Sequence, residues 1–387
     1  YEPKFKIENL GVIREGEFTQ KPLTIFCGPN NSGKTWVMYS LYYWSKMLSD
    51  PDFRCSQYYR ISNGHSVKPT NFKDIVNSGL AGVFNVKEAM LEGSRVDLVG
   101  SVKSLKVLLD EKRKTRNVIL MPVERSSLYP FYRNIGNRST TLPHHVAEGI
   151  YSPSESLRDT MRSYYAQPIA DYIDWLSEIP EIMREGRGGF HKCADVLRKR
   201  LLRGTFSINR RTGDITFKSH QAKCEGHKVR PVNLHIASAT VKSLFGLWFY
   251  LEYQAQKGDL LMIEEPEINL HPANQVEMAR LLARLINAGL RLVISTHSDY
   301  IVRELNSLIM LNQQGSSGMR KQYRYKEEEV LDPEKVSAYQ FDDQVIEPME
   351  IFMEDGIYAI TFDKVIAMQE KSNDDIYYTM KERRDGY

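Results

Sequence analysis

The sequence is poor in cysteine and has no long apolar run. Its 387 residues include four cysteines, Cys27, Cys55, Cys193 and Cys224, and none of them forms a C-x-x-C pair. The sequence therefore predicts neither a zinc ribbon nor a disulfide framework, as is typical of proteins in a reducing cytosol. No run of 18 apolar residues is present, and the first residues show no signal-peptide pattern. We therefore expect a cytoplasmic chain that does not enter a membrane.

The charge balance and the absence of repeats argue against a uniformly basic nucleic-acid binder and against a repeat or long coiled-coil protein. A net charge of +3 is too small for a uniformly basic nucleic-acid binder, so any contact with DNA has to be local. The runs KRKTR (112–116) and RKRLLR (198–203) are candidates, although such runs more often form solvated faces. No internal repeat occurs, and no heptad pattern is sustained over three units, so no long coiled coil is expected.

The segment GPNNSGKT (28–35) fits the pattern G-x-x-x-x-G-K-[ST] in full. A β-leaning run, LTIFC (23–27), precedes it and an amphipathic helical pattern, TWVMYSLYYWSKML (35–48), follows, which is the context of a phosphate-binding P-loop. Backbone N–H groups and the helix dipole would then face phosphate oxygens. Lys34 would reach the β- and γ-phosphates and the Thr35 hydroxyl would bind Mg²⁺. The residues predicted to bind the nucleotide are Gly28, Pro29, Asn30, Asn31, Ser32, Gly33, Lys34 and Thr35.

A second motif, GDLLMIEEPEINLHP (258–272), is an apolar strand that ends in Glu264 and Glu265. Since a strand sends alternate side chains to opposite faces, one carboxylate can lie near Mg²⁺ while the next activates the attacking water. An amphipathic helix follows, and then RLVISTHSDY (291–300), a buried strand that places His297 within reach of a γ-phosphate. A lone histidine is more often a core residue, but its place after this strand and helix favours a role in the site.

The segments GPNNSGKT, IEEPEINLHP and ISTHSDY, in this order, resemble the ABC-type ATPases of the OLD-like class over nearly the whole chain. The resemblance implies an α/β fold, an ABC-type P-loop ATPase head with a mixed β-sheet, a helical insertion and a β-hairpin. MPVERSSL (121–128) resembles the Q-loop stretch of these proteins, and HIASATVKSLFGL (235–247) lies where they carry the ABC signature.

The resemblance also implies roles for single residues. Two heads dimerise face to face, and each ATP lies between the P-loop of one head and the signature of the other. Thr35 and Glu264 would hold Mg²⁺, Glu265 would activate water, and His297 would sense the γ-phosphate. Ser238 and Thr240 would contact the nucleotide of the partner head.

Two positions depart from the pattern of the family. Glu264 stands where aspartate is usual, and its extra methylene changes its reach towards Mg²⁺. Thr240 stands where glycine is usual, so its side chain either adds a hydroxyl contact or blocks the approach of the partner's phosphate. Both departures favour slow hydrolysis or a nucleotide-gated clamp.

The expected organisation has four parts. Residues 1–137 form the N-terminal part of the head with the P-loop, and 138–230 a helical insertion with a β-hairpin. Residues 231–330 carry the signature, the Walker B acids and the His switch, and 331–387 form a C-terminal extension packed on the head. Helices are expected at 86–114 and 140–203, and hairpins at 204–220 and 355–366. The aromatics Tyr164, Tyr165, Tyr172 and Trp175 would form an interface or fill a small helical core.

The acidic stretches after His297, EEE (327–329) and FDD (341–343), do not make the E…DxD set of a Toprim nuclease, so no nuclease is expected here. The resemblance implies a separate nuclease or other effector, as in the Septu and PARIS anti-phage systems, with DNA or a phage protein as trigger. An SMC-like DNA-repair or chromosome ATPase is an alternative, and it would need a long heptad arm. A transporter subunit would need an LSGGQ-like signature where ASATVK stands.

Overall fold

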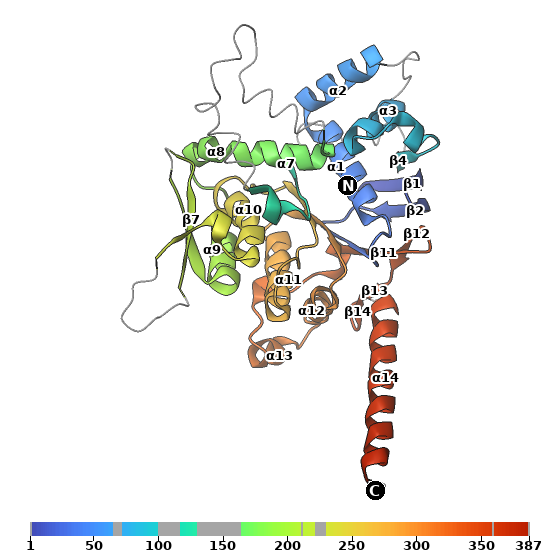
Figure 1. The fold of residues 1–387 in the computed structure, drawn as a ribbon, viewed down its shortest axis with the longest axis vertical. Coiled ribbons are helices and arrows are strands. Elements are labelled where there is room, and N and C mark those ends of the chain that lie inside the picture. The colour runs from blue at the N-terminus through green and yellow to red at the C-terminus, as the bar shows by residue number, and fades with distance from the viewer. Residues whose placement is uncertain are drawn as a thin grey trace.

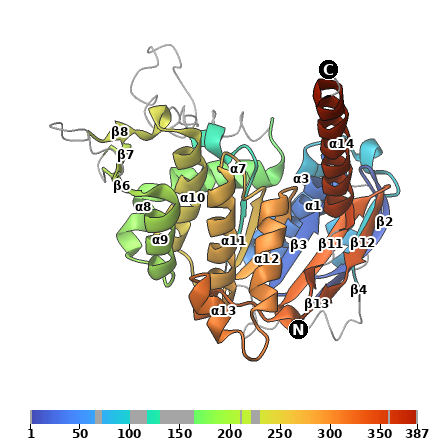
Figure 2. The same ribbon diagram turned by 90° about the horizontal axis from the view of Figure 1, so that it is seen from below.

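The computed structural model shows an α/β body from which one C-terminal helix projects (Figure 1). The residues that it describes are 2–64, 72–99, 117–129, 164–209, 212–220, 230–357 and 360–385. The projecting helix is α14 (Ile360–Asp385), and in the second view helices lie on both sides of a central sheet (Figure 2). None of the helices in these ranges is both long and apolar enough to span a membrane.

A nine-stranded mixed sheet runs through the body. From one edge to the other its strands are β4 (Arg95–Val99), β1 (Lys4–Leu10), β2 (Ile13–Thr19), β12 (Val345–Met349), β11 (Val336–Asp342), β3 (Leu23–Cys27), β10 (Arg291–Thr296), β9 (Leu260–Glu264) and β5 (Val118–Met121). The run from β11 to β5 is parallel, whereas β1 pairs antiparallel with β2 and β4. The expected α/β class with a mixed sheet is confirmed.

The parallel strands at the centre are continuous apolar segments because helices cover both of their faces. Every residue of β3 and of β9 is buried. α1 (Lys34–Ser49) packs against β5, β9 and β10, whereas α11 (Pro272–Asn287) and α12 (Asp299–Met310) lie on the opposite face (Figure 2). The carboxyl ends of β3, β9 and β10 meet at one edge of the sheet, so the residues that follow them come together.

Between β5 and β9, the described residues from Gln167 to Leu202 are mainly helical, and strands and a further helix follow them. Its elements are α7 (Gln167–Ser177), α8 (Ile179–Glu185), α9 (His191–Leu197), η4 (Arg198–Leu202), β6 (Gly204–Ile208), β7 (Ile215–Ser219), β8 (Val232–Asn233), η5 (Leu234–Ile236) and α10 (Ala239–Tyr253). β6 and β7 pair antiparallel, which confirms the hairpin expected at 204–220. Residues 140–163 of the expected helical region lie outside the described part of the chain.

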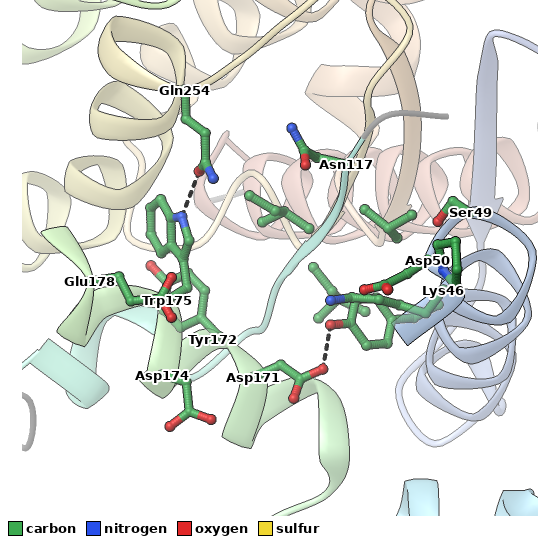
Figure 3. A pocket seen from close by; sticks show the side chains of 15 residues that line it. Lys46, Ser49, Asp50, Asn117, Asp171, Tyr172, Asp174, Trp175, Glu178 and Gln254 are labelled. Carbon is green, nitrogen blue, oxygen red and sulfur yellow. Dashed lines mark hydrogen bonds between the residues drawn. The ribbon is translucent and has the colours of Figure 1, made fainter. Parts of the chain in front are cut away.

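The aromatic residues of α7 face the head rather than solvent. Tyr172 and Trp175 are buried, whereas Tyr164, just before the helix, is 77% exposed. The Trp175 indole Nε1 donates to Gln254 Oε1 at 2.7 Å, beside a pocket of about 430 Å³ that α7 shares with α1 and β5 (Figure 3). Of the two alternatives, a core position therefore holds for Tyr172 and Trp175, whereas the exposed Tyr164 is available for an interface.

One expected helix is a strand. The helical expectation for 86–114 is wrong at Arg95–Val99, which forms the edge strand β4, and only Glu88–Leu91 forms one 3₁₀ turn, η1. Val96 and Leu98 are buried, and the Trp44 indole donates to the Val96 carbonyl at 2.8 Å. The alternation of only two apolar positions was too short to be recognised as a strand. Residues 100–116 lie outside the described ranges.

The C-terminal residues enter the sheet before they leave the body. Residues 336–349, expected in an extension, form β11 and β12, and β11 lies directly beside β3. β13 (Ile351–Phe352) and β14 (Gly356–Ile357) then form a small hairpin. The hairpin expected at 355–366 is wrong from residue 360 onwards, since α14 begins there. The remaining elements are α2 (Pro51–Gly64), α3 (Phe72–Phe84), α13 (Ser317–Gln322), η6 (Glu327–Glu329) and η7 (Pro333–Lys335).

Candidate nucleotide-binding site

The loop between β3 and α1 has a backbone conformation that requires glycine. Gly28 has φ +151° and Gly33, directly before α1, has φ +98°. A Cβ atom on Gly33 would lie 2.6 Å from Ile13 Cγ1, and one on Gly28 would lie 2.5 Å from the Phe341 carbonyl oxygen of β11. The loop is thus held between the β1–β2 turn and a strand from the far end of the chain.

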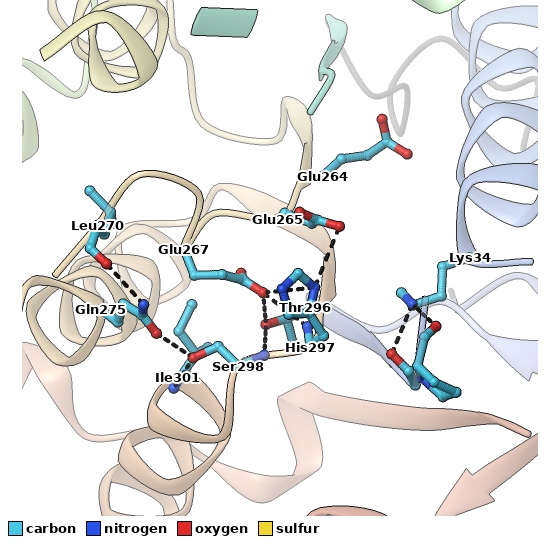
Figure 4. Close-up of polar contacts among 12 residues, drawn as sticks. Lys34, Glu264, Glu265, Glu267, Leu270, Gln275, Thr296, His297, Ser298 and Ile301 are labelled. Carbon is cyan, nitrogen blue, oxygen red and sulfur yellow. Dashed lines mark hydrogen bonds and ion pairs between the residues drawn. The ribbon is translucent and has the colours of Figure 1, made fainter. Parts of the chain in front are cut away.

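Lys34 is bonded to the loop that precedes it. Its Nζ donates to the carbonyl oxygens of Gly28 at 2.9 Å and Pro29 at 2.7 Å, and to Ser32 Oγ at 3.3 Å (Figure 4). Burial lowers the pKa of Lys34, although nearby carboxylates, Glu265 first among them, oppose that shift. The ammonium group is therefore a buried cation at the start of α1, where the helix dipole also favours anions.

A pocket of about 620 Å³ brings the P-loop and the acidic residues together. The predicted site residues that line it are Asn30, Asn31, Ser32, Gly33, Lys34, Thr35, Glu264, Glu265 and His297. They come from the ends of β3, β9 and β10 and from the start of α1. Gly28 and Pro29 contribute to the same place through the carbonyl groups that accept from Lys34. This convergence is what the motif order predicted.

Glu264 ends β9 as a buried carboxyl group. Burial raises its pKa to about 7, and a hydrogen bond from the Thr35 hydroxyl opposes this shift. Its Oε2 atom has no hydrogen-bond partner among the residues that the structure describes. Burying such an oxygen costs free energy unless a cation binds it or a hydrogen-bond donor contacts it. Thr35 and Glu264 therefore adjoin, as expected of two ligands of one ion.

The donor set fits Mg²⁺ bound together with a nucleotide. Across the described ranges, no group of three or more His, Cys, Asp or Glu side chains could hold a metal ion by itself. Mg²⁺ is usually held by one or two carboxylates, with water and substrate phosphates as the other ligands. The Thr35 hydroxyl and the free oxygen of Glu264 would supply the protein's share.

Glu265 and His297 face each other across the pocket. Glu265 has φ +45°, and its Oε1 lies 3.4 Å from His297 Nδ1 (Figure 4). Glu267 supports this pair, because its Oε1 accepts from Thr296 Oγ1 at 2.8 Å and from the His297 backbone N–H at 2.9 Å. Glu267 was not among the predicted site residues, although its place in the same motif, three residues after Glu264, was a usable signal.

The predicted signature residues, Ser238 and Thr240, lie away from the P-loop of their own chain. Ser238 caps the N-terminus of α10, with its Oγ accepting from the Val241 N–H at 3.3 Å. The Thr240 hydroxyl donates to the Asn269 carbonyl at 2.6 Å. Both line a separate pocket of about 510 Å³ together with His271. The structure therefore does not bring Ser238 and Thr240 to the P-loop of their own chain.

Comparisons with known proteins give one partial sequence match and several loose structural ones. Residues 201–302 match the model of a family described as AAA ATPase domain, and this span includes Glu264, Glu265 and His297 but not the P-loop. No curated protein matches the chain in sequence.

Three solved structures of SMC heads are similar in fold. An Smc head with an extended coiled coil from Pyrococcus furiosus, bound to the C-terminal domain of ScpA, has 11% identity and a TM-score of 0.37 and covers 96% of this chain and 99% of its own. An SmcHead bound to the C-winged helix domain of ScpA has 13% identity, a TM-score of 0.40 and coverage of 90% and 96%. The SMC head domain from Thermotoga maritima has 11% identity, a TM-score of 0.35 and coverage of 91% and 99%. These scores are low, and no property of those proteins is carried over.

The class of the protein follows from its own topology, its P-loop and the match at residues 201–302. The fold is that of an ABC-type P-loop ATPase head, with a mixed sheet, a helical region and a β-hairpin.

Proposed function

We propose that the chain binds ATP with Mg²⁺, hydrolyses it in a head-to-head dimer, and controls a separate effector, a nuclease, in an anti-phage defence system. The observation that carries the ATPase part is the single pocket in which the P-loop, Glu264, Glu265 and His297 meet. The defence role rests on the resemblance of the three motifs to OLD-like ATPases.

Each side chain of the pocket has a task in this proposal. Lys34 and the backbone N–H groups of the loop bind the phosphates, while Thr35 and Glu264 hold Mg²⁺, which offsets phosphate charge. Glu265 accepts the proton of the attacking water. His297, held by Glu267 through its backbone N–H, faces the γ-phosphate. Both the longer Glu264 and Thr240 favour slow turnover.

The position of Ser238 and Thr240 is consistent with the proposed dimer. They lie in a pocket separate from the P-loop of their own chain, and in this proposal they contact the nucleotide of a second head. In the described part of the chain no long heptad arm leaves the head, so the SMC-like alternative gains no support from the fold.

The test has two arms. In the first, purified chain is mixed with Mg²⁺ and a fluorescent ATP analogue, and phosphate release is then followed; absence of binding overturns the proposal entirely. In the second, cells carrying the chain with its neighbouring genes are challenged with phage. Protection that is lost with Lys34→Ala supports the defence role, whereas equal plaque counts with and without the genes overturn that role alone.

A further inference from the structure

Arg125 is a buried cation in the MPVERSSL stretch, and the sequence analysis assigned it no role. It lies four residues after β5 and is only 4% exposed. Its guanidinium donates to four backbone carbonyl groups: Glu264 at 2.6 Å, Glu265 at 2.7 Å, Pro122 at 3.0 Å and Ser243 at 3.3 Å. These acceptors belong to three segments that are far apart in the sequence.

The chemistry of this contact depends on the shape of the guanidinium group. Its N–H groups form a rigid planar fork, so they fix the directions of the carbonyl groups that accept from them. Burial lowers the pKa of Arg125, while the nearby charges of Glu267, Glu264 and Glu265 oppose that shift. Within the described ranges no carboxylate forms an ion pair with Arg125, so its direct partners are peptide dipoles.

Arg125 acts on the peptide groups on both sides of the Glu265 Cα atom. The Glu264 and Glu265 carbonyl groups belong to consecutive peptides, and Glu265 between them has the left-handed φ of +45°. A residue with a Cβ atom adopts this conformation only where its surroundings impose it. These two hydrogen bonds act together with two backbone bonds, from the Glu265 N–H to the Ser295 carbonyl and from the Ile268 N–H to the Glu265 carbonyl, to hold the backbone that directs the Glu265 side chain.

The same contact reaches the helix that carries the signature. Arg125 Nε donates to the carbonyl of Ser243 on α10, and the Ser243 hydroxyl lies 3.4 Å from the Ile268 carbonyl. The Thr240 hydroxyl donates to the Asn269 carbonyl. Two direct contacts, and Arg125 as a bridge, therefore connect the first turns of α10 with the acid turn, which we define as residues 264–269.

We propose that Arg125 is a positioning residue, which fixes the acid turn for metal binding and water activation and joins it to α10. This inference rests on the proposed ATPase function. Because α10 begins with the signature residues, movement of one head's signature is transmitted to the acidic residues of that same head.

The test compares Arg125→Lys and Arg125→Gln with the matched control Arg303→Lys, which changes an exposed arginine on α12. Lysine keeps the charge but lacks the planar fork. We expect both Arg125 variants to bind a fluorescent ATP analogue within about threefold of wild type and to lose about 10²-fold in kcat, the scale of a 1 Å misplacement. KM should stay unchanged, and Arg303→Lys should match wild type.

Backbone hydrogen exchange of the nucleotide-free chain gives a second readout. In Arg125→Lys, faster exchange confined to residues 264–270 and the start of α10 supports positioning. A wild-type kcat in Arg125→Lys contradicts the positioning role and shows that the charge alone suffices. Unfolding of both variants contradicts it as well and shows that Arg125 has a purely structural role. If the wild-type chain itself releases no phosphate, the proposed function fails, and the exchange pattern still decides whether Arg125 holds the turn.

Discussion

The burial of Glu264 raises its pKa and so affects how this side chain can bind a cation. Its pKa of about 7 means that the isolated head holds this carboxyl group partly protonated at neutral pH. Metal ligands must be deprotonated, so binding of Mg²⁺ at this position releases a proton. The affinity for Mg²⁺ with nucleotide should therefore fall as pH decreases below 7.

Without nucleotide or metal, the free energy of unfolding should depend on the protonation of Glu264. Because the folded pKa of Glu264 lies above the unfolded value, wild type loses stability as pH rises from about 5 to about 7, by up to roughly 3 kcal/mol. Glu264→Gln mimics the protonated form and should not share this loss. Melting curves of both chains at pH 5 and 7.5 test this prediction. The stability of the variant relative to wild type should increase as pH rises, and a difference in stability that is the same at both pH values contradicts the raised pKa of Glu264.

Lys34→Ala should abolish nucleotide binding, because it removes the buried cation of the pocket that would contact the phosphates. Fluorescent ATP analogue titration measures this, with Lys21→Ala, outside the pocket, as the control. Binding by Lys34→Ala at wild-type strength would refute the assignment of the site.

Glu265→Gln should keep ATP binding and lose hydrolysis by about 10²–10⁴-fold, the usual contribution of a positioned base. The amide preserves shape while removing the proton acceptor. Single-turnover phosphate release is the measurement. Normal hydrolysis by Glu265→Gln together with loss in Glu264→Gln would mean that the two roles are reversed.

At the scale of elements, α7 is joined to the head by its buried face. The Trp175 indole bonds to Gln254 beyond the end of α10, and Asp171 accepts from the Tyr42 hydroxyl of α1 at 2.6 Å. α7 therefore supports α1, the helix that begins at the P-loop.

Trp175→Ala should lower the free energy of unfolding by about 3–5 kcal/mol, the usual cost of removing a buried tryptophan. Tyr164→Ala, at a 77% exposed position, is the matched control and should change it by less than about 0.5 kcal/mol. Urea unfolding at a temperature where both chains are folded provides the comparison. An equal effect of the two changes would show that α7 does not pack as described.

Elements with local signals were predictable and those defined by distant partners were not. β3, α1, β9, α11 and β10 follow from apolar periodicity and glycine positions within their own sequences. Arg125 gave no such signal, since its partner Ser243 lies 118 residues away. The residues of β11 likewise show their place only through pairing with β3. The candidate site residues could be predicted because short sequence patterns contain them, whereas the residues that support them are defined by tertiary contacts.

At the scale of the whole molecule, the proposed dimer predicts how the ATPase rate depends on protein concentration. If Ser238 acts on the nucleotide of a partner, the ATPase rate per subunit should rise with protein concentration until dimers are saturated. Ser238→Arg should block closure but leave its own P-loop intact.

Mixing Ser238→Arg with Lys34→Ala should restore one competent site per heterodimer, formed by the P-loop of the first chain and the signature of the second. Phosphate release by the mixture, set against each variant alone, measures this. A mixture as inactive as its components, or a fully active monomer, rules out the shared site, and Thr240 at the glycine position would then be the first cause to examine.

The place of β11 in the sheet has a consequence for how the protein is made. β1, β2 and β4 connect to β3 only through β12 and β11, which end at residue 349. At about 5–20 residues per second, a ribosome needs roughly 15 to 65 s after finishing β3 before these strands emerge. During that time the nascent chain holds two partial sheets with open edges at β2 and β3, where chaperones or premature pairing would compete. The Phe341 carbonyl that lies against Gly28 belongs to β11, so the P-loop lacks this contact until β11 has emerged from the ribosome.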